Sequence, residues 1–368
     1  MSDNKKLAVE KLDRNMAVNE VQEEKIKWFS ADDAPLRLTG FYFRKKGDVF
    51  RRFPLDDKLP PSVNGLSWHT AGGQLAFISD SKFVRIKVAL GHESLMDHCT
   101  KIGSSGFDIY MGKPGEKQYF CGSSRIKVHN DSYEVDMFRS EHAEMREFTL
   151  NFPLYCGIDS FEIGFSEDAA VKAPSPWKDD APVVVYGTSI TQGGCANRPG
   201  MAYTNILSRR FNRPFLNYGF SGSGRGEPYV FEQLAKIENP AMFILDYEAN
   251  AHKEGIFNTL KNGIDILREK HPEVPIVVVS QFHFNREYII TGSVTARVKD
   301  AEDTWRFERA EVNRRRRAGD KNIYFVYGGW KNEEDWTEFT VDGIHATDLG
   351  FYMFAKMITP KIAKVLDK

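Results

Sequence analysis

The chain has 368 residues, 41% of them hydrophobic and 27% charged, and this composition is typical of a globular protein long enough for two domains. Lysine and arginine number 50 against 51 aspartate and glutamate residues. This charge balance gives no electrostatic reason to expect nucleic acid or an anionic membrane as a partner. A small neutral substrate fits it better.

The N-terminus is polar and charged, and it lacks the apolar segment of about seven or more residues that a signal peptide requires. No apolar run in the chain approaches the ~18 residues that cross a bilayer. The sequence therefore predicts no membrane partner. It indicates a cytoplasmic protein if the chain is complete, and a periplasmic or secreted protein if a leader has been removed.

The four cysteines are far apart in the sequence and lack the CxxC spacing of zinc ribbons and redox dithiols. They are Cys99, Cys121, Cys156 and Cys195. We therefore expect four isolated thiols. No other motif indicates a metal or a cofactor, and we expect neither.

The N-terminal part of the chain has the pattern of a β-rich domain. Residues 1–25 are charged and weakly periodic, and we expect an arm there. From residue 26 to residue 174, short apolar or alternating runs are separated by turn residues, without a long helical period. This pattern predicts an antiparallel β-sandwich. The runs are LRLTGFYF, QLAFISD, KFVRIKVAL, SGFDIYMG, REFTLNFPLY and DSFEIGFS.

The pattern changes after a proline-rich segment, residues 167–182, which we interpret as a linker with the domain boundary near Pro174. From residue 182 to residue 368, apolar strands alternate with longer helical stretches, which is typical of a parallel sheet flanked by helices. The sequence therefore predicts a three-layer α/β/α domain. Its predicted strands are 183–186, 215–218, 242–246, 276–280 and 323–327, and its predicted helices are 201–211, 228–236, 253–270, 298–317 and 347–365.

Four short motifs follow predicted strands or lead into the last helix. They are GTSIT from Gly187, NYGFSG from Asn217, DYEAN from Asp246 and DGIH from Asp342. Because the carboxyl ends of parallel strands meet at one edge of a sheet, we expect the motifs to lie there together. Each motif alone has commoner structural uses, such as a helix cap or a turn. Their shared position favours a catalytic site.

The residue types in these motifs fit nucleophilic catalysis. Ser189 needs a base to accept its proton, and His345 suits this task because a free imidazole titrates near neutral pH. Asp342, three residues before His345, can bond the second ring nitrogen and stabilise the imidazolium. A carbonyl under attack needs preorganised donors for its negative charge. We expect these to be the backbone N–H groups of Ser189 and Gly222 and the side-chain amide of Asn250.

The same residues carry a resemblance to a known family. YGTSITQGG, NYGFSGSG, DYEAN and VDGIHATDLGF resemble the sequence blocks of SGNH hydrolases of the GDSL type. Thr188 stands where many members have aspartate, and DYEAN stands in place of the usual GxND. The resemblance implies a flavodoxin-like hydrolase domain whose blocks supply Ser189, Gly222, Asn250 and His345.

SGFDIYMG, with Gly106, Asp108 and Tyr110, resembles the GxDLY-type β-sandwich domain that precedes one branch of these hydrolases. Together the two resemblances imply a two-domain serine esterase, a carboxylic ester hydrolase that works through an acyl-enzyme. By analogy they imply deacetylation of carbohydrates. The expected substrate is a small-molecule or oligosaccharide ester with a short acyl group such as acetyl.

Several alternatives stay open. An alcohol rather than water could resolve the acyl-enzyme, which would make the protein an acyltransferase, and a preference for long acyl chains would make it lipase-like. Asp246 and Glu248 could form the carboxylate pair of a glycoside hydrolase, although hydrogen-bonded loop acids are commoner. The non-enzymatic alternative is a carbohydrate-binding protein with an inactive hydrolase domain. Tyr247, His283 and Trp330 follow predicted strands and are candidate substrate-pocket residues.

Overall fold

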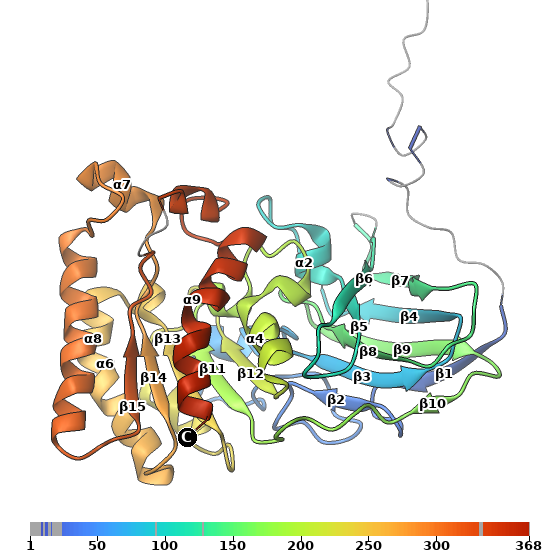
Figure 1. Cartoon of the computed structure of the whole chain (residues 1–368), viewed down its shortest axis with the longest axis horizontal. Coiled ribbons are helices and arrows are strands. Elements are labelled where there is room, and N and C mark those ends of the chain that lie inside the picture. The colour runs from blue at the N-terminus through green and yellow to red at the C-terminus, as the bar shows by residue number, and fades with distance from the viewer. Residues whose placement is uncertain are drawn as a thin grey trace, which may run out of the picture.

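The two predicted domains lie next to each other along the long axis of the molecule (Figure 1). The computed structural model describes residues 24–92, 94–126, 129–330 and 334–367, together with residues 9, 12, 13 and 16. The predicted arm, residues 1–25, falls almost entirely outside these described residues. Within them, none of the helices combines the length and the apolar character that a membrane span needs.

Two antiparallel sheets form the N-terminal domain, which confirms the predicted β-sandwich. One sheet has the strand order β1-β9-β4-β7, and the other has the order β10-β3-β8-β5-β6 with β2 paired to β3. Alternate apolar side chains from both sheets, such as Phe77 of β3 and Ile86 of β4, meet in a buried core. The strands are β1 (Ile26–Ser30), β2 (Arg37–Thr39), β3 (Gln74–Ser79), β4 (Phe83–Leu90), β5 (Asp108–Met111), β6 (Tyr119–Ser123), β7 (Ser132–Arg139), β8 (Arg146–Asn151), β9 (Ile158–Ser166) and β10 (Val171–Lys172).

Six elements of this domain are absent from the sequence-based prediction: β1, β6, β7 and β10 and the short helices α1 (Pro61–Leu66) and α2 (Lys101–Ser105). No residue of β6 is buried and only two of β7 are, so the apolar alternation along these strands is weak. β10 lies inside the predicted linker, where Val171 pairs with Ser79 of β3. The segment that connects the two domains therefore contains β10, an edge strand of the sandwich. The domain boundary near Pro174 stays a prediction.

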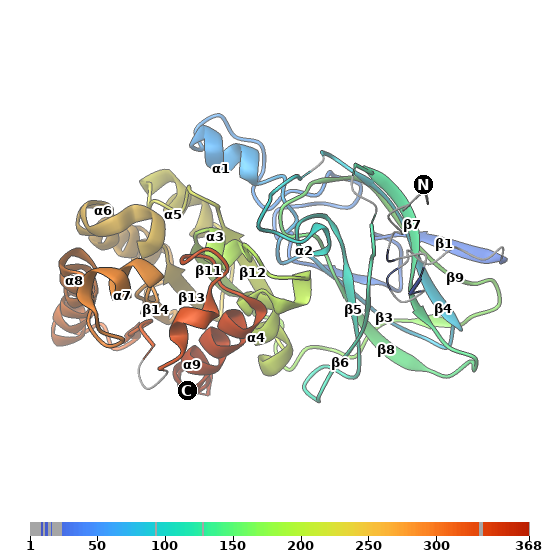
Figure 2. The same cartoon turned by 90° about the horizontal axis from the view of Figure 1, so that it is seen from above.

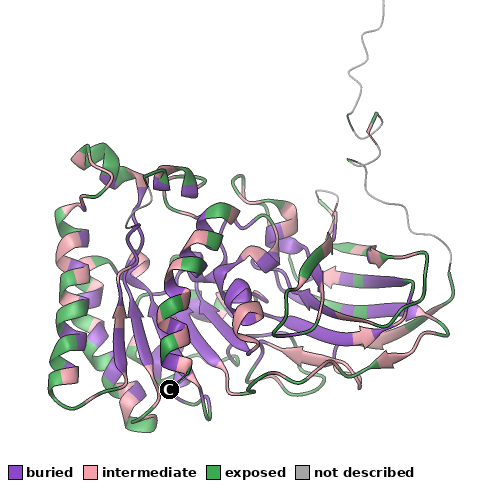
Figure 3. Ribbon diagram, in the orientation of Figure 1, coloured by how far each residue is buried: buried purple, intermediate pink, exposed green. Residues whose placement is uncertain are grey.

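Five parallel strands form the sheet of the C-terminal domain in the order β12-β11-β13-β14-β15, which confirms the three-layer α/β/α prediction. Each predicted strand is present, as β11 (Val183–Gly187), β12 (Phe215–Gly219), β13 (Met242–Asp246), β14 (Ile276–Val279) and β15 (Ile323–Val326). The sheet is buried almost throughout (Figure 3). Its helices are α3 (Ser189–Gln192), α4 (Tyr203–Phe211), α5 (Pro228–Leu234), α6 (Glu248–Lys270), α7 (Asn285–Thr291), α8 (Lys299–Arg317) and α9 (Asp348–Leu366).

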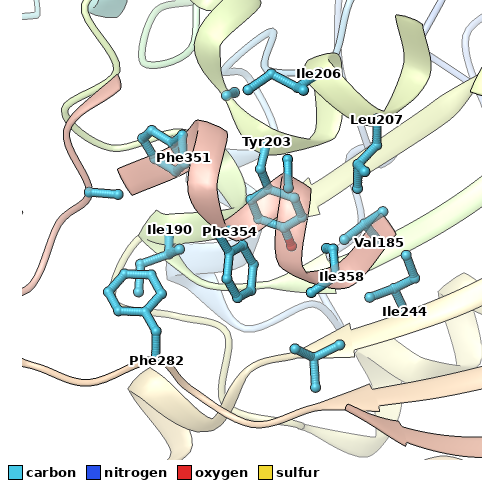
Figure 4. Close-up of a cluster of buried hydrophobic side chains, with 14 of the residues drawn as sticks. Val185, Ile190, Tyr203, Ile206, Leu207, Ile244, Phe282, Phe351, Phe354 and Ile358 are labelled. Atoms are coloured by element: carbon cyan, nitrogen blue, oxygen red, sulfur yellow. The ribbon is translucent and has the colours of Figure 1, made fainter. Parts of the chain in front are cut away.

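Helices cover both faces of this sheet, which explains the uninterrupted apolar run of β11. Val185 faces a core with α4 and α9, including Tyr203 and Phe354 (Figure 4). Tyr186 faces the opposite core, with residues of α5 and α6. Seen from above, α5, α6 and α8 lie on one side of the sheet and α4 and α9 on the other (Figure 2). The chain breaks at His252 within α6, where φ is 52°, so the regular helix continues from residue 253 as predicted.

Candidate active site

The carboxyl ends of three neighbouring strands are in register. Gly187 at the end of β11 pairs with Gly219 of β12 on one side and with Asp246 of β13 on the other. The first three predicted motifs therefore begin at the same edge of the sheet. The loop before α9 brings the fourth motif to the same edge, because His345 contacts Ser189.

Ser189 is the first residue of α3, a single helical turn that sequence analysis did not predict. The Thr188 hydroxyl caps this turn by accepting a hydrogen bond from the Ile190 N–H at 3.2 Å. A threonine oxygen thus supplies the cap at the position where the resemblance implies aspartate in many family members. Ser189 is 6% exposed, since the turn lies against the sheet edge.

Ser189, His345 and Asp342 form a continuous hydrogen-bonded chain, which we name the Ser–His–Asp cluster. Ser189 Oγ lies 2.9 Å from His345 Nε2, and His345 Nδ1 lies 2.6 Å from Asp342 Oδ2. The second carboxylate oxygen, Oδ1, accepts hydrogen bonds from the backbone N–H groups of Ile344 and His345 at 2.9 and 2.7 Å. In such a chain the imidazole can take the serine proton while the carboxylate holds the ring.

Local hydrogen bonds keep Asp342 ionised and its loop in place. Partial burial raises the pKa of Asp342, but the hydrogen bonds from His345 and Ile344 outweigh this effect, so its pKa lies below the usual value. Asn285, at the start of α7, donates its backbone N–H to the Gly343 carbonyl at 2.9 Å and accepts from the Thr340 hydroxyl at 3.2 Å. No sequence pattern indicates this role of Asn285, because only the fold brings it to this loop.

The loop after β12 packs against the end of β11, because the Phe220 N–H donates to the Gly187 carbonyl at 3.0 Å. Gly222 has a φ of +66°, which favours glycine, and a Cβ at this position would meet no atom within 4 Å. The left-handed backbone conformation therefore favours glycine here, and the space beside its Cα is open. No acceptor among the described residues binds the backbone N–H of Ser189 or Gly222. Asn250 Oδ1 accepts from the Gly224 N–H at 3.3 Å, which leaves its amide nitrogen as a donor.

Gln192 connects this loop to the N-terminal domain, and it was not among the predicted site residues although it directly follows the GTSIT motif. Its Oε1 accepts from the Ser221 N–H at 3.0 Å, and its Nε2 donates to the Leu154 carbonyl at 2.9 Å. The same Nε2 lies 2.9 Å from His69 Nδ1. Burial, with the nearby Arg52 and His92, lowers the pKa of His69 to about 3, so the ring is neutral and can accept this bond.

Arg52 adds a second support from the N-terminal domain. Its fully buried guanidinium donates to the carbonyl oxygens of Asn217 and Leu66 at 3.1 and 2.8 Å and also to that of Gly219. Burial without a carboxylate partner lowers its pKa to about 9. The sandwich domain therefore holds the end of β12, where the loop that carries Gly222 begins.

The three candidate pocket residues occupy packing positions. Tyr247 is buried against Tyr186 and bonds Thr259 at 3.1 Å. His283 stacks on Trp336, and its Nδ1 accepts from the backbone N–H of Trp330 at 3.0 Å. Burial lowers the pKa of His283 to about 3. Trp330 itself is buried in the core beside α9. His283 and Trp330 also line a pocket together with Trp305 and Tyr327, and the role of the three candidate residues in a substrate pocket stays a prediction.

Asp246 and Glu248 do not form an open carboxylate pair. Asp246 is buried and accepts from Thr191 Oγ1 and the Tyr203 hydroxyl at 3.0 and 2.8 Å. Glu248 is buried and accepts from the backbone N–H of Gln281 at 2.7 Å. Both acids are bonded within the core, which disfavours the glycoside hydrolase alternative.

The expectation of four isolated thiols is wrong for two of them. Cys99 Sγ lies 3.6 Å from Cys195 Sγ, although 96 positions separate them in the chain. The spacing of the cysteines in the sequence cannot predict this contact, because the contact depends on how the two domains pack.

Comparisons with known proteins agree with this architecture. Residues 180–363 match the model of the GDSL-like lipase/acylhydrolase family, and residues 26–171 match the N-terminal domain model of SGNH hydrolase-type esterases. A crystal structure of a GDSL-like lipase from Bacteroides ovatus is 31% identical, covers 93% of this chain and 98% of its own, and has a TM-score of 0.81. No curated protein sequence matched the chain.

Two further solved structures share the fold at lower identity. A salicylyl-acyltransferase, SsfX3, from a tetracycline biosynthetic pathway is 16% identical over 94% of this chain and 98% of its own, with a TM-score of 0.73. A family two carbohydrate esterase from Clostridium thermocellum, in complex with cellohexaose, is 14% identical over 81% of this chain and 93% of its own, with a TM-score of 0.56.

A β-sandwich ahead of a parallel α/β/α domain, with Ser189 in the turn after β11, is the architecture that the two matching family models assign to SGNH-type hydrolases. The chain belongs to the GDSL-like lipase/acylhydrolase family, with a GxDLY-type N-terminal domain, and it is a carboxylic ester hydrolase.

Proposed function

We propose that the protein is a serine esterase that removes short acyl groups, acetyl above all, from carbohydrate esters. The observation that carries this proposal is the hydrogen-bonded chain from Ser189 Oγ through His345 to Asp342, with links of 2.9 and 2.6 Å. This geometry provides a nucleophile, a base and an orienting carboxylate in contact.

In this mechanism Ser189 Oγ attacks the ester carbonyl while His345 Nε2 accepts the hydroxyl proton. The N–H groups of Ser189 and Gly222 and the amide of Asn250 stabilise the oxyanion. His345 then gives its proton to the departing alcohol, which leaves an acyl group on Ser189. Water, deprotonated by the same imidazole, releases the acid and restores the serine.

The openness of the cluster supports a polar substrate. The side chains of Asp342 and His345 are 32% and 22% exposed, so the base and its carboxylate lie at the molecular surface, next to the buried Ser189. A sugar ester can stay partly solvated at such a site. The fold likeness to a carbohydrate esterase bound to cellohexaose points in the same direction.

The first test is the hydrolysis of p-nitrophenyl acetate by the Ser189→Ala variant. We expect kcat/KM to fall by about 10³-fold or more, since the nucleophile is lost while the oxyanion donors stay. Ser62→Ala, at an exposed position of α1, is the matched control and should keep full activity. Equal activity of the Ser189→Ala and wild-type proteins would disprove the mechanism.

The substrate class needs a separate experiment. We expect acetate release from acetylated oligosaccharides, and kcat/KM values for p-nitrophenyl esters that decline as the acyl chain lengthens. Faster hydrolysis of long-chain esters would overturn the carbohydrate assignment and make the enzyme lipase-like, without affecting the Ser189 mechanism.

Acyl transfer is the second candidate, favoured by the fold likeness to a salicylyl-acyltransferase over almost the whole chain. The acyl-enzyme would be the same, and an alcohol would replace water in the second step. Product analysis with p-nitrophenyl acetate and a large excess of a sugar alcohol distinguishes the two. Hydrolysis predicts mainly acetate, whereas transfer predicts mainly the acetylated alcohol.

A further inference from the structure

Cys99 and Cys195 bring the two domains into contact beside the Ser–His–Asp cluster. Cys99 lies in the connection between β4 and α2 and is half-buried, whereas Cys195 follows the nucleophile turn and is buried. Their sulfur atoms are 3.6 Å apart. An ordinary disulfide has an S–S distance of about 2.05 Å, so a closing movement of roughly 1.5 Å would join them.

Neighbouring contacts hold the two segments together. The Thr100 hydroxyl donates to the Asn197 carbonyl at 2.7 Å, and Gly103 packs so closely that a Cβ there would lie 2.0 Å from the Ala196 carbonyl oxygen. Cys195 has a φ of +70°, which few non-glycine residues adopt. These contacts on both sides fix the positions from which the two thiols meet.

Both cysteines adjoin residues that touch the Ser–His–Asp cluster. His98 Nε2 lies 3.9 Å from Asp342 Oδ2, and the rings of His98 and His345 have centroids 5.6 Å apart. On the other side, Gly194 faces the same ring, since a Cβ on it would lie 3.2 Å from His345 Cδ2. A bond between the two sulfurs would therefore act on both walls around His345.

We propose that Cys99 and Cys195 form an oxidisable pair that a peroxide or a small-molecule disulfide closes to a reversible disulfide between the two domains. With hydrogen peroxide, the Cys99 thiolate attacks one oxygen, which breaks the O–O bond and gives a sulfenic acid and water after protonation. The Cys195 sulfur then attacks the sulfenic sulfur. The S–S bond forms, the hydroxyl leaves with the Cys195 proton as a second water, and two thiols have been oxidised by one peroxide.

The acidity of the two thiols fits these unequal roles. The hydrogen bond from the Cys195 thiol lowers the pKa of Cys99 to about 7, despite the opposing effect of burial, and the neighbouring His98 contributes. The same hydrogen bond, with burial, raises the pKa of Cys195. The accessible thiol is thus the one that ionises, and the buried thiol resolves the intermediate.

The thiol count is the first test, and it does not depend on the proposed function. The reduced protein has four free cysteines. After treatment with hydrogen peroxide or oxidised glutathione and removal of the reagent, we expect two titratable thiols, a mass lower by two hydrogen atoms, and a disulfide-linked peptide pair containing Cys99 and Cys195. Dithiothreitol should restore all four thiols.

Matched variants make this result specific. Cys99→Ser and Cys195→Ser should each lose the linked peptide pair, whereas Cys121→Ser, on β6, should keep it. The proposal is overturned if the linked pair is absent from oxidised wild-type protein, or if the purified protein holds stoichiometric zinc that keeps both thiols reduced. A zinc ion on His98, Cys99 and Cys195 would give the cluster a metal-binding role instead.

Ester turnover tests whether the disulfide affects the Ser–His–Asp cluster, and this second experiment rests on the proposed function. We expect kcat for p-nitrophenyl acetate to fall about tenfold on oxidation and to recover with dithiothreitol, because small displacements around His345 disturb its alignment. The Cys99→Ser variant should not respond. Unchanged turnover in fully oxidised wild-type protein would overturn the coupling, while the Ser189→Ala result would still judge the esterase mechanism by itself.

Discussion

At the scale of single residues, Gln192 links more parts of the site than any residue predicted from the sequence. Its side chain bonds the backbone of Ser221, next to Gly222, and a carbonyl of the sandwich domain. It lies in the same helical turn as Ser189. Gln192 therefore connects the turn that carries Ser189 to the loop that carries Gly222, and we expect it to act as a positioning residue.

Replacement of Gln192 by alanine should lower kcat for p-nitrophenyl acetate by roughly 10- to 100-fold and change KM little. The reason is that donors for the oxyanion act on the transition state, so their misplacement affects turnover more than binding. Steady-state kinetics measures both constants. Gln118→Ala is the matched control, because the Gln118 amide also donates to a carbonyl, that of Gly112, but within the sandwich hairpin. A rise in KM with unchanged kcat would contradict the assignment.

At the scale of secondary-structure elements, β13 ends in a buried acid that joins two helices. Asp246 accepts hydrogen bonds from Thr191 of α3 and from Tyr203 of α4. Burial raises the pKa of Asp246 to about 7, although the two hydrogen bonds oppose this rise. The packing of α3 and α4 on the sheet is thus linked to protonation of this carboxyl.

The folded state binds a proton at Asp246 over a pH range in which the unfolded chain has released it. The stabilising contribution of this group is therefore complete below about pH 4 and is lost as the pH rises through 7. In Asp246→Asn, which keeps an accepting oxygen, this part of the pH dependence should vanish. Urea unfolding at pH 5 and pH 8 should show the variant gaining stability relative to wild type at the higher pH.

Asp57→Asn, at an exposed position, controls for the loss of one negative charge. Its stability relative to wild type should be the same at both pH values. A difference between Asp246→Asn and wild type that does not vary with pH would show that Asp246 keeps its ordinary pKa in the folded protein.

At the scale of the whole molecule, the GxDLY-like motif joins the two domains. Asp108 is fully buried, and its carboxylate accepts from the Arg198 guanidinium and the Gly200 N–H, both at 2.8 Å, and from Asn151 at 2.8 Å. The Tyr110 hydroxyl bonds the same guanidinium. The loop between α3 and α4 is therefore held to the sandwich by an ion pair between the buried Asp108 and the partly buried Arg198.

Asp108→Ala should destabilise the protein by about 3 kcal/mol, because it leaves a partly buried guanidinium and a buried N–H without their acceptor. Thermal unfolding followed by circular dichroism would detect the lowered midpoint. Glu167→Ala is the control, since its ion pair with Lys25 is solvent-exposed and should contribute less than ~1 kcal/mol. Equal midpoints for Asp108→Ala and wild type would exclude a stabilising role for this contact.

The sequence by itself determined the fold class and the approximate position of every strand of the parallel sheet. These features depend on local information: β11 and β13 are uninterrupted apolar runs because both of their faces are covered. It also brought Ser189, Asp342 and His345 together, since strand order and the rule for parallel sheet edges need no side-chain detail. Strands with no or few buried residues, such as β6, have too weak an alternation of apolar and polar residues to be predicted from the sequence.

Only the tertiary structure decided which side chains near that edge face the reacting groups and which fill the core. His283 and Trp330 have the same sequence context as an active-site residue, yet both are packed in the interior. Gln192, Arg52 and the pair of Cys99 with Cys195 act through partners far away in the chain. Such contacts arise from the docking of one domain on the other, and their energies depend on burial and distance, which no local pattern records.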